Sequence, residues 1–510
     1  MTITDAASMR RGVLVATITA SSMAFIDGSV VQIALPAVQR DLGADFATLQ
    51  WIVSIYNLFL GALVMVGGAV GDSIGRRRVF VLGTVLFIVA SLACGLAPSA
   101  GLLVVVRAVQ GVGAALMVPQ SLALIAATHA EAIRGRAIGT WAAASALTTV
   151  IGPPLGGFLV DALSWRAAFL INLPVGMFAL WATLRYVPES RARPAKPVDW
   201  VAGVVATIGL GGLTAGLVYL PPNGIADPVV IAGFAAAIVG LPAFVIWEAR
   251  AQDPMVPLSL FGDRTFALVN LLTVLLYGAL SGALFIVPYT LIGLGGYTAA
   301  EAGTAMLPMA LAIGLLSRTF GSVSDRFGYR PPLIIGSAIV AAALAWLAVT
   351  RAEGGYLAGV LGPLASIGFG MSIVISPLTT AVMNAVGSGL SGTASGINNA
   401  AARVAGLLAV AVTGALAVAV FRPELASLLA GDPIDPAAAA RIVAQSDRLL
   451  DIPALGDVPT AMRAPAVAAV RDAYRLAITV AIGASAALAA LAAAVGLLLP
   501  TPSRRDGQLQ

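Results

Sequence analysis

The feature that most constrains this chain is a succession of long apolar segments separated by short polar ones. A helix needs about 20 apolar residues to cross the hydrocarbon core of a membrane. About fourteen such segments follow one another, near residues 12–36, 46–70, 79–97, 102–127, 137–160, 167–187, 199–220, 229–247, 266–292, 302–323, 332–350, 356–382, 395–420 and 474–500. We therefore expect an all-α polytopic membrane protein rather than a soluble enzyme.

Composition supports this expectation and limits the chemistry available. Hydrophobic residues make up 59% of the 510 residues and charged residues only 10%, against about 25% charged in an average soluble domain. One cysteine (Cys94) and one histidine (His129) exclude an internal disulfide, a cysteine metal cluster and any site that needs two histidines. We expect no enzymatic activity, no metal and no cofactor. The net charge of +5 does not indicate nucleic-acid binding, because the arginines are spread over short loops.

The distribution of arginine predicts the orientation. If the N-terminus lies inside, the cytoplasmic loops and ends hold most of the arginines, and the short outer loops hold only Arg40, Arg166 and Arg351. Cytoplasmic loops of membrane proteins carry such an excess of positive charge. The first apolar segment has no cleavage site after it and is expected to be retained. We expect both termini in the cytoplasm, in a bacterial plasma (inner) membrane.

An internal repeat predicts the domain organisation. The pattern G-x-x-x-D-x-x-G-x-R occurs at 68–77 and again at 321–330, each time after the second helix of a six-helix set. We therefore expect a six-helix bundle at 1–198, a two-helix insertion at 199–264, and a second six-helix bundle at 265–510 with an extracytoplasmic loop at about 421–472. Transporters built from such repeats place the substrate site between them, near the middle of the bilayer.

The repeated pattern suggests a gating element. Its glycines allow tight turns and close helix approach, and its aspartate could pair with arginines in one conformation only. A basic topology anchor with a turn is the alternative. The candidate gating residues are Gly68, Asp72, Gly75, Arg76, Arg77, Asp325, Gly328 and Arg330.

Two charges lie deep inside predicted spans. Asp27 is the only acidic residue well inside a span, and Arg107 is the matching cation in the fourth. A buried carboxylate is costly unless it is protonated or paired, which makes Asp27 a candidate proton carrier. A static ion pair, or a position near the outer interface, is the alternative. Arg318 and Arg403 are expected near cytoplasmic helix ends, with mainly structural roles.

The fifth segment contains two adjacent prolines among glycines. Prolines interrupt the helical hydrogen-bond ladder, and glycines leave a smooth face that could slide against a neighbour. A passive kink is the alternative. The residues concerned are Gly152, Pro153, Pro154, Gly156 and Gly157.

Together these motifs resemble the major facilitator superfamily, and more narrowly its fourteen-spanner drug–proton antiporters of the multidrug efflux type. Four stretches match in order: DGSVVQIALP at 27–36, GAVGDSIGRRR at 68–78, RAVQGVG at 107–113 and GPPLGG at 152–157. Trp165-Arg166 and Asn172-Leu173-Pro174 match the family's entry into helix six. Gln32 and Ile292 depart from it, standing where relatives usually have Asn and Gln.

The resemblance implies an antiporter that exports amphipathic drugs or other small toxic compounds by alternating access, driven by the proton gradient. We expect a monomer, with a periplasmic adaptor if the cell is Gram-negative. An exporter of an endogenous metabolite or lipid, a nutrient importer, and a membrane enzyme or sensor are the alternatives. Candidate residues of the substrate cavity are Tyr56, Asn57, Gln110, Phe285 and Tyr289.

Overall fold

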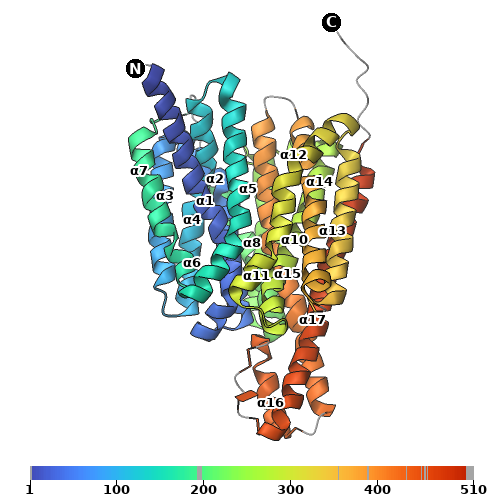
Figure 1. The fold of residues 1–510 in the computed structure, drawn as a ribbon. Helices are drawn as coiled ribbons and strands as arrows, with labels where there is room; N and C mark the ends of the chain where they lie inside the picture. Colours follow the sequence, from blue (N-terminus) through green and yellow to red (C-terminus); the bar gives the residue numbers. More distant parts are fainter. Residues whose placement is uncertain are drawn as a thin grey trace.

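The computed structural model describes residues 3–191, 198–353, 355–386, 390–431, 434–449, 451–452, 455–456 and 458–500. Only the backbone is described for residues 3–6, 131, 132, 143, 146, 149, 323, 325, 391, 392 and 461. The described chain contains helices and no strand (Figure 1). Thirteen of its helices are long and apolar enough to cross a membrane.

The first half of the chain forms a bundle of membrane helices. It contains α1 (Ile3–Leu42), α2 (Phe46–Ile74), α3 (Arg76–Gly95), α4 (Ala100–Thr128), α5 (Glu131–Ala162), α6 (Ala167–Leu170) and α7 (Asn172–Tyr186). Because α5 is 32 residues long and includes the apolar stretch Val150–Ala162, it supplies the fourteenth predicted segment. The all-α membrane fold expected from the sequence is therefore confirmed.

Glycine lets helices in this bundle pack with their backbones in contact. A β-carbon placed on Gly67 of α2 would lie 2.1 Å from the carbonyl oxygen of Ala115 in α4. Gly113 of α4 lies equally close to α3, where a β-carbon would be 2.8 Å from the amide nitrogen of Phe87. Small residues at such crossings supply the close packing that holds membrane helices together.

The second half forms another bundle, beside the first in Figure 1. It contains α10 (Arg264–Tyr289), η2 (Thr290–Leu294), α11 (Ala299–Ala305), α12 (Leu307–Phe327), α13 (Arg330–Thr350), η3 (Tyr356–Leu361), α14 (Gly362–Asn384), α15 (Ser391–Gly431) and α17 (Thr460–Leu498). Two further helices, α8 (Trp200–Asn223) and α9 (Pro228–Arg250), join the halves. They pack against each other, and α8 also contacts α2 and α15. The 3-10 turn η1 (Leu258–Gly262) precedes α10.

A helical extension projects from the end of the molecule opposite the start of α1 (Figure 1). The sequence shows a long loop at 421–472, but α15 continues to Gly431 and α17 already begins at Thr460. Between them lie α16 (Pro436–Ala444) and η5 (Ser446–Arg448). Asp435 caps α16 by accepting the N–H of Ala438 at 3.1 Å. We call residues 421–472 the outer extension. The end of the molecule that carries it is called the outer end, and the opposite end the inner end.

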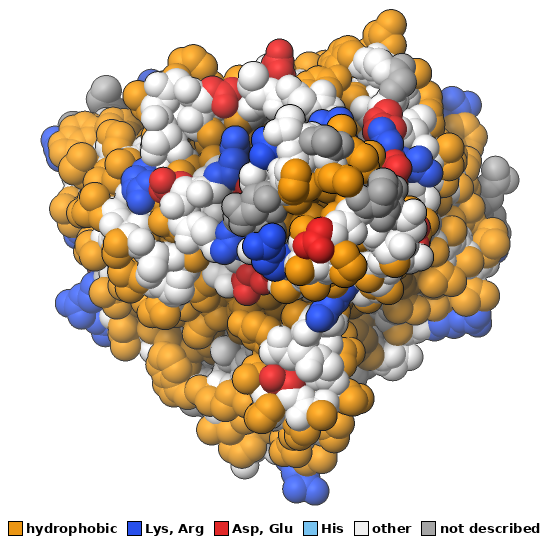
Figure 2. Space-filling view, turned by 90° about the horizontal axis from the view of Figure 1, so that it is seen from below, with side chains coloured by type: hydrophobic (Ala, Val, Ile, Leu, Met, Phe, Trp, Pro, Cys, Tyr) orange, Lys and Arg blue, Asp and Glu red, His pale blue; other side chains and the backbone are white. Residues whose placement is uncertain are grey.

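The outer extension contacts both the first half and the joining helices. The side-chain amide of Gln39, in α1, donates to the carbonyl of Arg448 at 3.0 Å. Arg422 donates to the carbonyl of Pro222, in α8, at 3.2 Å. Figure 2 views this end of the molecule, where charged side chains gather on the projecting face and apolar ones occupy much of the margin. The outer extension therefore links three parts of the fold on one side.

The two bundles touch mainly at the same outer end. Asp161, at the end of α5, accepts the N–H groups of Ala299 and Ala300 of α11 at 3.3 and 2.7 Å. Gln50, near the start of α2, donates to the carbonyl of Val410 in α15 at 3.0 Å. Further along these helices, a β-carbon on Gly139 of α5 or on Gly314 of α12 would meet nothing within 4 Å. The contacts described between the bundles thus lie towards the outer end, and we also call the inner end, which carries the N-terminus of α1, the open end.

Candidate functional site

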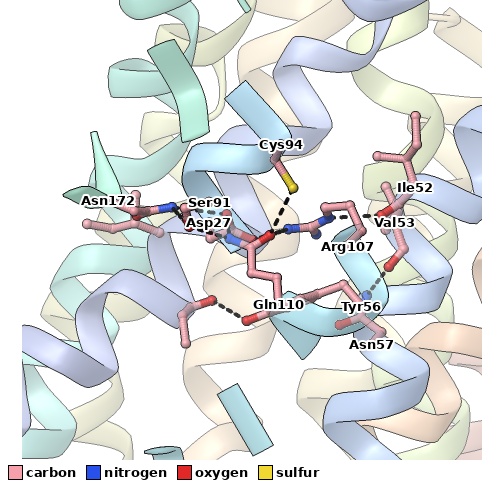
Figure 3. Close-up of polar contacts among 12 residues, drawn as sticks. Asp27, Ile52, Val53, Tyr56, Asn57, Ser91, Cys94, Arg107, Gln110 and Asn172 are labelled. Carbon is pink, nitrogen blue, oxygen red and sulfur yellow. Dashed lines mark hydrogen bonds and ion pairs between the residues drawn. The ribbon is translucent and has the colours of Figure 1, made fainter. Parts of the chain in front are cut away.

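A buried ion pair lies at the centre of the first bundle. Asp27 of α1 and Arg107 of α4 are 0% and 1% exposed, and Arg107 Nη1 contacts Asp27 Oδ2 (Figure 3). The structure therefore brings together the two deep charges singled out in the sequence, which are 80 residues apart along the chain. Such a pair is tolerable inside the membrane only if its remaining hydrogen-bonding groups are also satisfied.

A ring of neutral polar groups supplies those hydrogen bonds. Gln110 Nε2 donates to the other carboxylate oxygen of Asp27 at 2.8 Å, and Asn172 Nδ2 donates to it at 3.2 Å. Gln110 Oε1 accepts from Arg107 at 2.7 Å, so one glutamine side chain bridges both charges. Arg107 Nε donates to the carbonyl of Ile52 at 3.1 Å. Each charge therefore has more than one partner, and the arginine does not depend on Asp27 alone.

Two further contacts fix this arrangement. The Arg107 guanidinium lies over the ring of Tyr56, 4.3 Å from its centroid, and a cation is attracted to the face of an aromatic ring. Ser91 Oγ accepts from Gln110 at 2.8 Å. Ser91 and the Ile52 carbonyl had no signal in the sequence. Asn172 had a partial signal, because Asn172-Leu173-Pro174 matches the family's entry into helix six. In the structure it begins α7, directly after a break in the helix at Ile171.

The two copies of the G-x-x-x-D-x-x-G-x-R pattern form turns between helices. Gly75 and Gly328 have φ values of +126° and +78°, a backbone region that strongly favours glycine. Asp72 pairs with Arg76 of its own motif at 2.8 Å. Arg77 Nη2 donates to the carbonyl of Leu184 at 2.9 Å.

The second copy makes a related contact. Arg330 Nη2 donates to the carbonyl of Leu497 in α17 at 2.7 Å. The side chain of Asp325 lies outside the described residues. Gly68, at the start of the first copy, faces Pro119, which would lie 3.8 Å from an added β-carbon. Both copies thus tie a turn at the inner end to the last helix of their bundle.

The glycines of α5 lie where the two halves meet. A β-carbon on Gly156 would lie 2.9 Å from the side chain of Val30 in α1, and one on Gly152 would overlap Ser29. On the other side, a β-carbon on Gly157 would lie 2.1 Å from the carbonyl oxygen of Ala299 in α11. The helix continues through Pro153 and Pro154. This segment is therefore a two-sided junction between α1 and the second bundle.

Comparison with known proteins accounts for this architecture. The model of the Major Facilitator Superfamily matches residues 17–410. The chain belongs to this superfamily. The family expected from the sequence is thus confirmed, and transporters of this superfamily are generally not enzymes.

Several relatives in the superfamily are resistance and export proteins. The multidrug resistance protein Stp of Mycobacterium tuberculosis (strain CDC 1551 / Oshkosh) is 34% identical over 85% of this chain and 81% of its own length. The tetracenomycin C resistance and export protein of Streptomyces glaucescens is 34% identical over 77% of this chain and 73% of its own. These relatives support an efflux transporter of the superfamily, and the protein is a multi-pass membrane protein.

Solved structures show the same fold. A bacterial homologue of the human lysosomal transporter Spinster, in an inward-facing and unoccupied conformation, covers 97% of this chain and 99% of its own, with a TM-score of 0.66 and 18% identity. A bacterial homologue of the human peptide transporters PepT1 and PepT2 gives a TM-score of 0.58 at 14% identity. At these identities the likeness concerns the fold alone.

Most of the predicted cavity residues of this superfamily member are buried in the conformation observed. Tyr56, Gln110 and Phe285 are at most 1% exposed, and only Asn57 is partly exposed. Tyr56 and Gln110 belong to the Asp27–Arg107 network. The ring centroids of Phe285 and Tyr289 both lie 5.5 Å from that of Phe46. These rings therefore belong to the contact between the two halves at the outer end. Tyr289 also lines a cavity of about 190 Å³ beneath the outer extension.

The placement of Arg403 corrects an expectation. The sequence suggested a position near a cytoplasmic helix end. Instead, Arg403 is the thirteenth residue of the 41-residue α15, which begins at Ser391. It packs against the middle of α2, where a β-carbon added to Gly61 would lie 3.4 Å from the β-carbon of Arg403. Arg403 is therefore a second deep cation, contributed by the other half.

Proposed function

We propose that this superfamily member is a proton-coupled antiporter that exports amphipathic drugs or other small toxic compounds by alternating access. The observation that carries the proposal is Asp27, a fully buried carboxylate in the middle of α1 and in contact with Arg107. The other buried acid of the described chain, Glu248, lies in the last turn of α9 and accepts the N–H of Val256 at 3.0 Å. Asp27 therefore has the position expected of a proton carrier, whereas Glu248 stabilises a turn.

The network around Asp27 allows two protonation states. When Asp27 is ionised, it accepts hydrogen bonds from Gln110 and Asn172 and pairs with Arg107. When Asp27 is protonated, the attraction to Arg107 falls, while Arg107 keeps the Ile52 carbonyl and Gln110 Oε1 as acceptors. A protonated carboxyl can thus release α1 from α4 without stranding a bare cation, and such stranding would be the main cost of breaking the pair.

The rest of the fold supplies the elements for alternating access. The contacts that hold the halves together, from Asp161 and Gln50, lie at the outer end. They must break for the outer end to open. The glycine face of α5 touches α1 on one side, at Gly156, and α11 on the other, at Gly157. Movement of α1 after protonation of Asp27 would therefore reach the outer contacts through α5.

The remaining features of the proposal follow from orientation and energy source. The N-terminal end of α1 lies at the open end, which we assign to the cytoplasm, and the outer extension faces outside (Figure 1). The membrane is then a bacterial plasma (inner) membrane with both termini in the cytoplasm. The proton gradient supplies the energy, with no cofactor. We propose a monomer that uses a periplasmic adaptor only if the cell is Gram-negative.

Transport by purified protein in proteoliposomes tests the proposal. With an imposed pH gradient, the wild type should move a fluorescent drug against its concentration gradient, and Asp27→Asn should abolish this proton-driven accumulation. Asp227→Asn is the matched control: it makes the same exchange at the helix cap of α9, where Asn also caps well, and it should retain activity. Undiminished proton-driven transport by Asp27→Asn would show that another group carries the proton.

A further inference from the structure

Arg403 differs from Arg107 in its polar contacts. It makes no hydrogen bond or ion pair with any residue that the structure describes. Arg107, by contrast, has the Asp27 carboxylate, the Gln110 amide oxygen and the Ile52 carbonyl. A charged side chain within a membrane span is costly, and such residues normally pair with an opposite charge or mark a path for a substrate or ion. The missing partner is therefore informative.

The surroundings of Arg403 show that it borders open space on the inner side. Its side chain is partly exposed. Asn399, one turn closer to the inner end of α15, is exposed, and a β-carbon on Gly396, almost two turns closer, would meet nothing within 4 Å. These residues share one face of α15, because positions four and seven apart lie on the same side of a helix. An open face thus leads from the inner end of α15 to Arg403.

No acidic side chain among the described residues pairs with this cation. The carboxylate of Asp27, the deep acid of the first half, is already held by Arg107, Gln110 and Asn172. Tyr56 is engaged elsewhere, because its ring stacks on Arg107. The phenol hydroxyl of Tyr56 donates to the carbonyl of Ala24. None of the described residues thus supplies a partner for Arg403, which leaves a bound molecule as the candidate.

We propose that Arg403 is a substrate-binding residue that takes an anionic group, such as a carboxylate, of an amphipathic substrate entering from the open end. The proposal rests on the proposed export function and specifies its substrate class. Guanidinium groups suit this role because they remain charged and offer paired donors to a carboxylate. The substrate would bind with its anion at the second half, while proton chemistry stays at Asp27 in the first half. Acidic amphiphiles should then be preferred over cationic ones.

A pair of dyes with the same ring system and opposite charge tests this inference. Fluorescein carries a carboxylate, and rhodamine 6G is a cation. Binding of each to the purified full-length protein in detergent would be followed by fluorescence polarisation. We expect the wild type to bind fluorescein, and Arg403→Gln to bind it at least about 10-fold more weakly, because a hydrogen bond to a charged group is lost. Binding of rhodamine 6G should be unchanged or tighter.

Two further variants separate recognition from folding. Arg403→Lys keeps the charge but not the paired donors, and should bind fluorescein with an affinity between those of the wild type and Arg403→Gln. Arg318→Gln removes an exposed arginine of α12 and should leave the ratio of the two affinities unchanged. An equal loss of both dyes in Arg403→Gln, or the absence of fluorescein binding by the wild type, would overturn the proposal. Stabilisation by chloride without fluorescein binding would instead assign Arg403 to an inorganic anion, and would also overturn it.

The same assay keeps this inference separate from the proposed function. Dye binding needs no pH gradient, so Asp27→Asn should still bind fluorescein more tightly than Arg403→Gln does. If proton-driven transport fails but this difference persists, proton coupling is wrong and anion recognition stands. If transport is proton-driven but only cations are bound and moved, anion recognition is wrong and the proposed function stands.

Discussion

The two halves of the molecule share an architecture but differ in the buried polar groups that join their helices. In the first half, Asp27 and Arg107 form a charged pair that joins α1 to α4. In the second half, a hydrogen-bond network between two helices is neutral: Asn398 of α15 donates to Asn270 and Thr273 of α10 at 3.1 and 2.7 Å. The first network contains a group that can gain a proton, whereas the second contains none.

This difference suggests a division of labour between the halves. A neutral amide network holds α10 to α15 in any protonation state, so it suits a half that must keep one shape. A carboxylate paired with an arginine changes its interaction energy when it takes up a proton. On our proposals, the first half responds to the proton and the second half, through Arg403, holds the substrate. Four single substitutions and one double variant, described below, test this comparison.

The largest effect is expected from removing one charge of the first network. Arg107→Met should lower the free energy of unfolding by about 3–5 kcal/mol, because it leaves Asp27 buried without its cation. Combining it with Asp27→Asn should restore much of that loss, since the buried negative charge is then gone. Unfolding in detergent, followed by helix content, would measure both. Equal losses in the single and double variants would mean that the charge of Asp27 is not what makes the arginine necessary.

A smaller effect is expected from the neutral network. Asn398→Ala removes a donor to two buried acceptors, at Asn270 and Thr273, and should cost about 1–3 kcal/mol. The same unfolding measurement applies. The pH dependence of transport should stay as in the wild type, because no titrating group is altered. A shifted pH profile would show that the second half takes part in proton coupling, and would remove the contrast drawn above.

A still smaller loss of stability is expected from removing a contact between the halves. Asp161→Ala removes the acceptor for the N–H groups at the start of α11, a loss comparable to that of a helix cap, about 0.5–2 kcal/mol. It should shift the conformational equilibrium towards an open outer end. Spin labels at Leu163 and Thr304, both exposed at this end, would report a longer distance distribution. An unchanged distribution would mean that other contacts, such as that of Gln50, hold the outer end closed.

The smallest effect on stability is expected at the inner turn. Asp72 and Arg76 are partly exposed and four residues apart, so Asp72→Asn should cost only about 0.3–0.5 kcal/mol. If the motif is a gating element, transport rate should nevertheless fall several-fold while drug binding stays constant. Unchanged rates with normal stability would favour the alternative of a simple topology anchor.

Much of the fold could be predicted because its main determinants are local. Length and hydropathy define membrane helices, since the bilayer fixes how long an apolar helix must be. The cap of α16 at Asp435 is local in the same sense, because helix caps are set by a few neighbouring residues. The extent of α15 and α17 beyond the membrane was not visible. There, packing of the outer extension, rather than hydropathy, sustains the helices.

The candidate site was only partly predictable. Asp27 and Arg107 stand out because charge is rare in apolar segments, so each signals itself without any knowledge of contacts. Ser91 and the Ile52 carbonyl do not, because neutral polar groups occur in many membrane helices and a carbonyl has no sequence signature at all. The burial of Phe285 and Tyr289 also depends on which end of the molecule is closed, and that is a property of the conformation.

The sequence by itself determined that this protein is a membrane transporter of two related halves, with one deep acid and a matching base in the first. These conclusions depend on composition, periodicity and order along the chain. Only the tertiary structure decided that Asp27 and Arg107 meet within a hydrogen-bond network while Arg403, far from them in sequence, has no hydrogen-bond or ion-pair partner among the described residues. The reason is physical: whether a buried charge is satisfied depends on what the neighbouring helices bring to it, and helix packing decides which helices are neighbours.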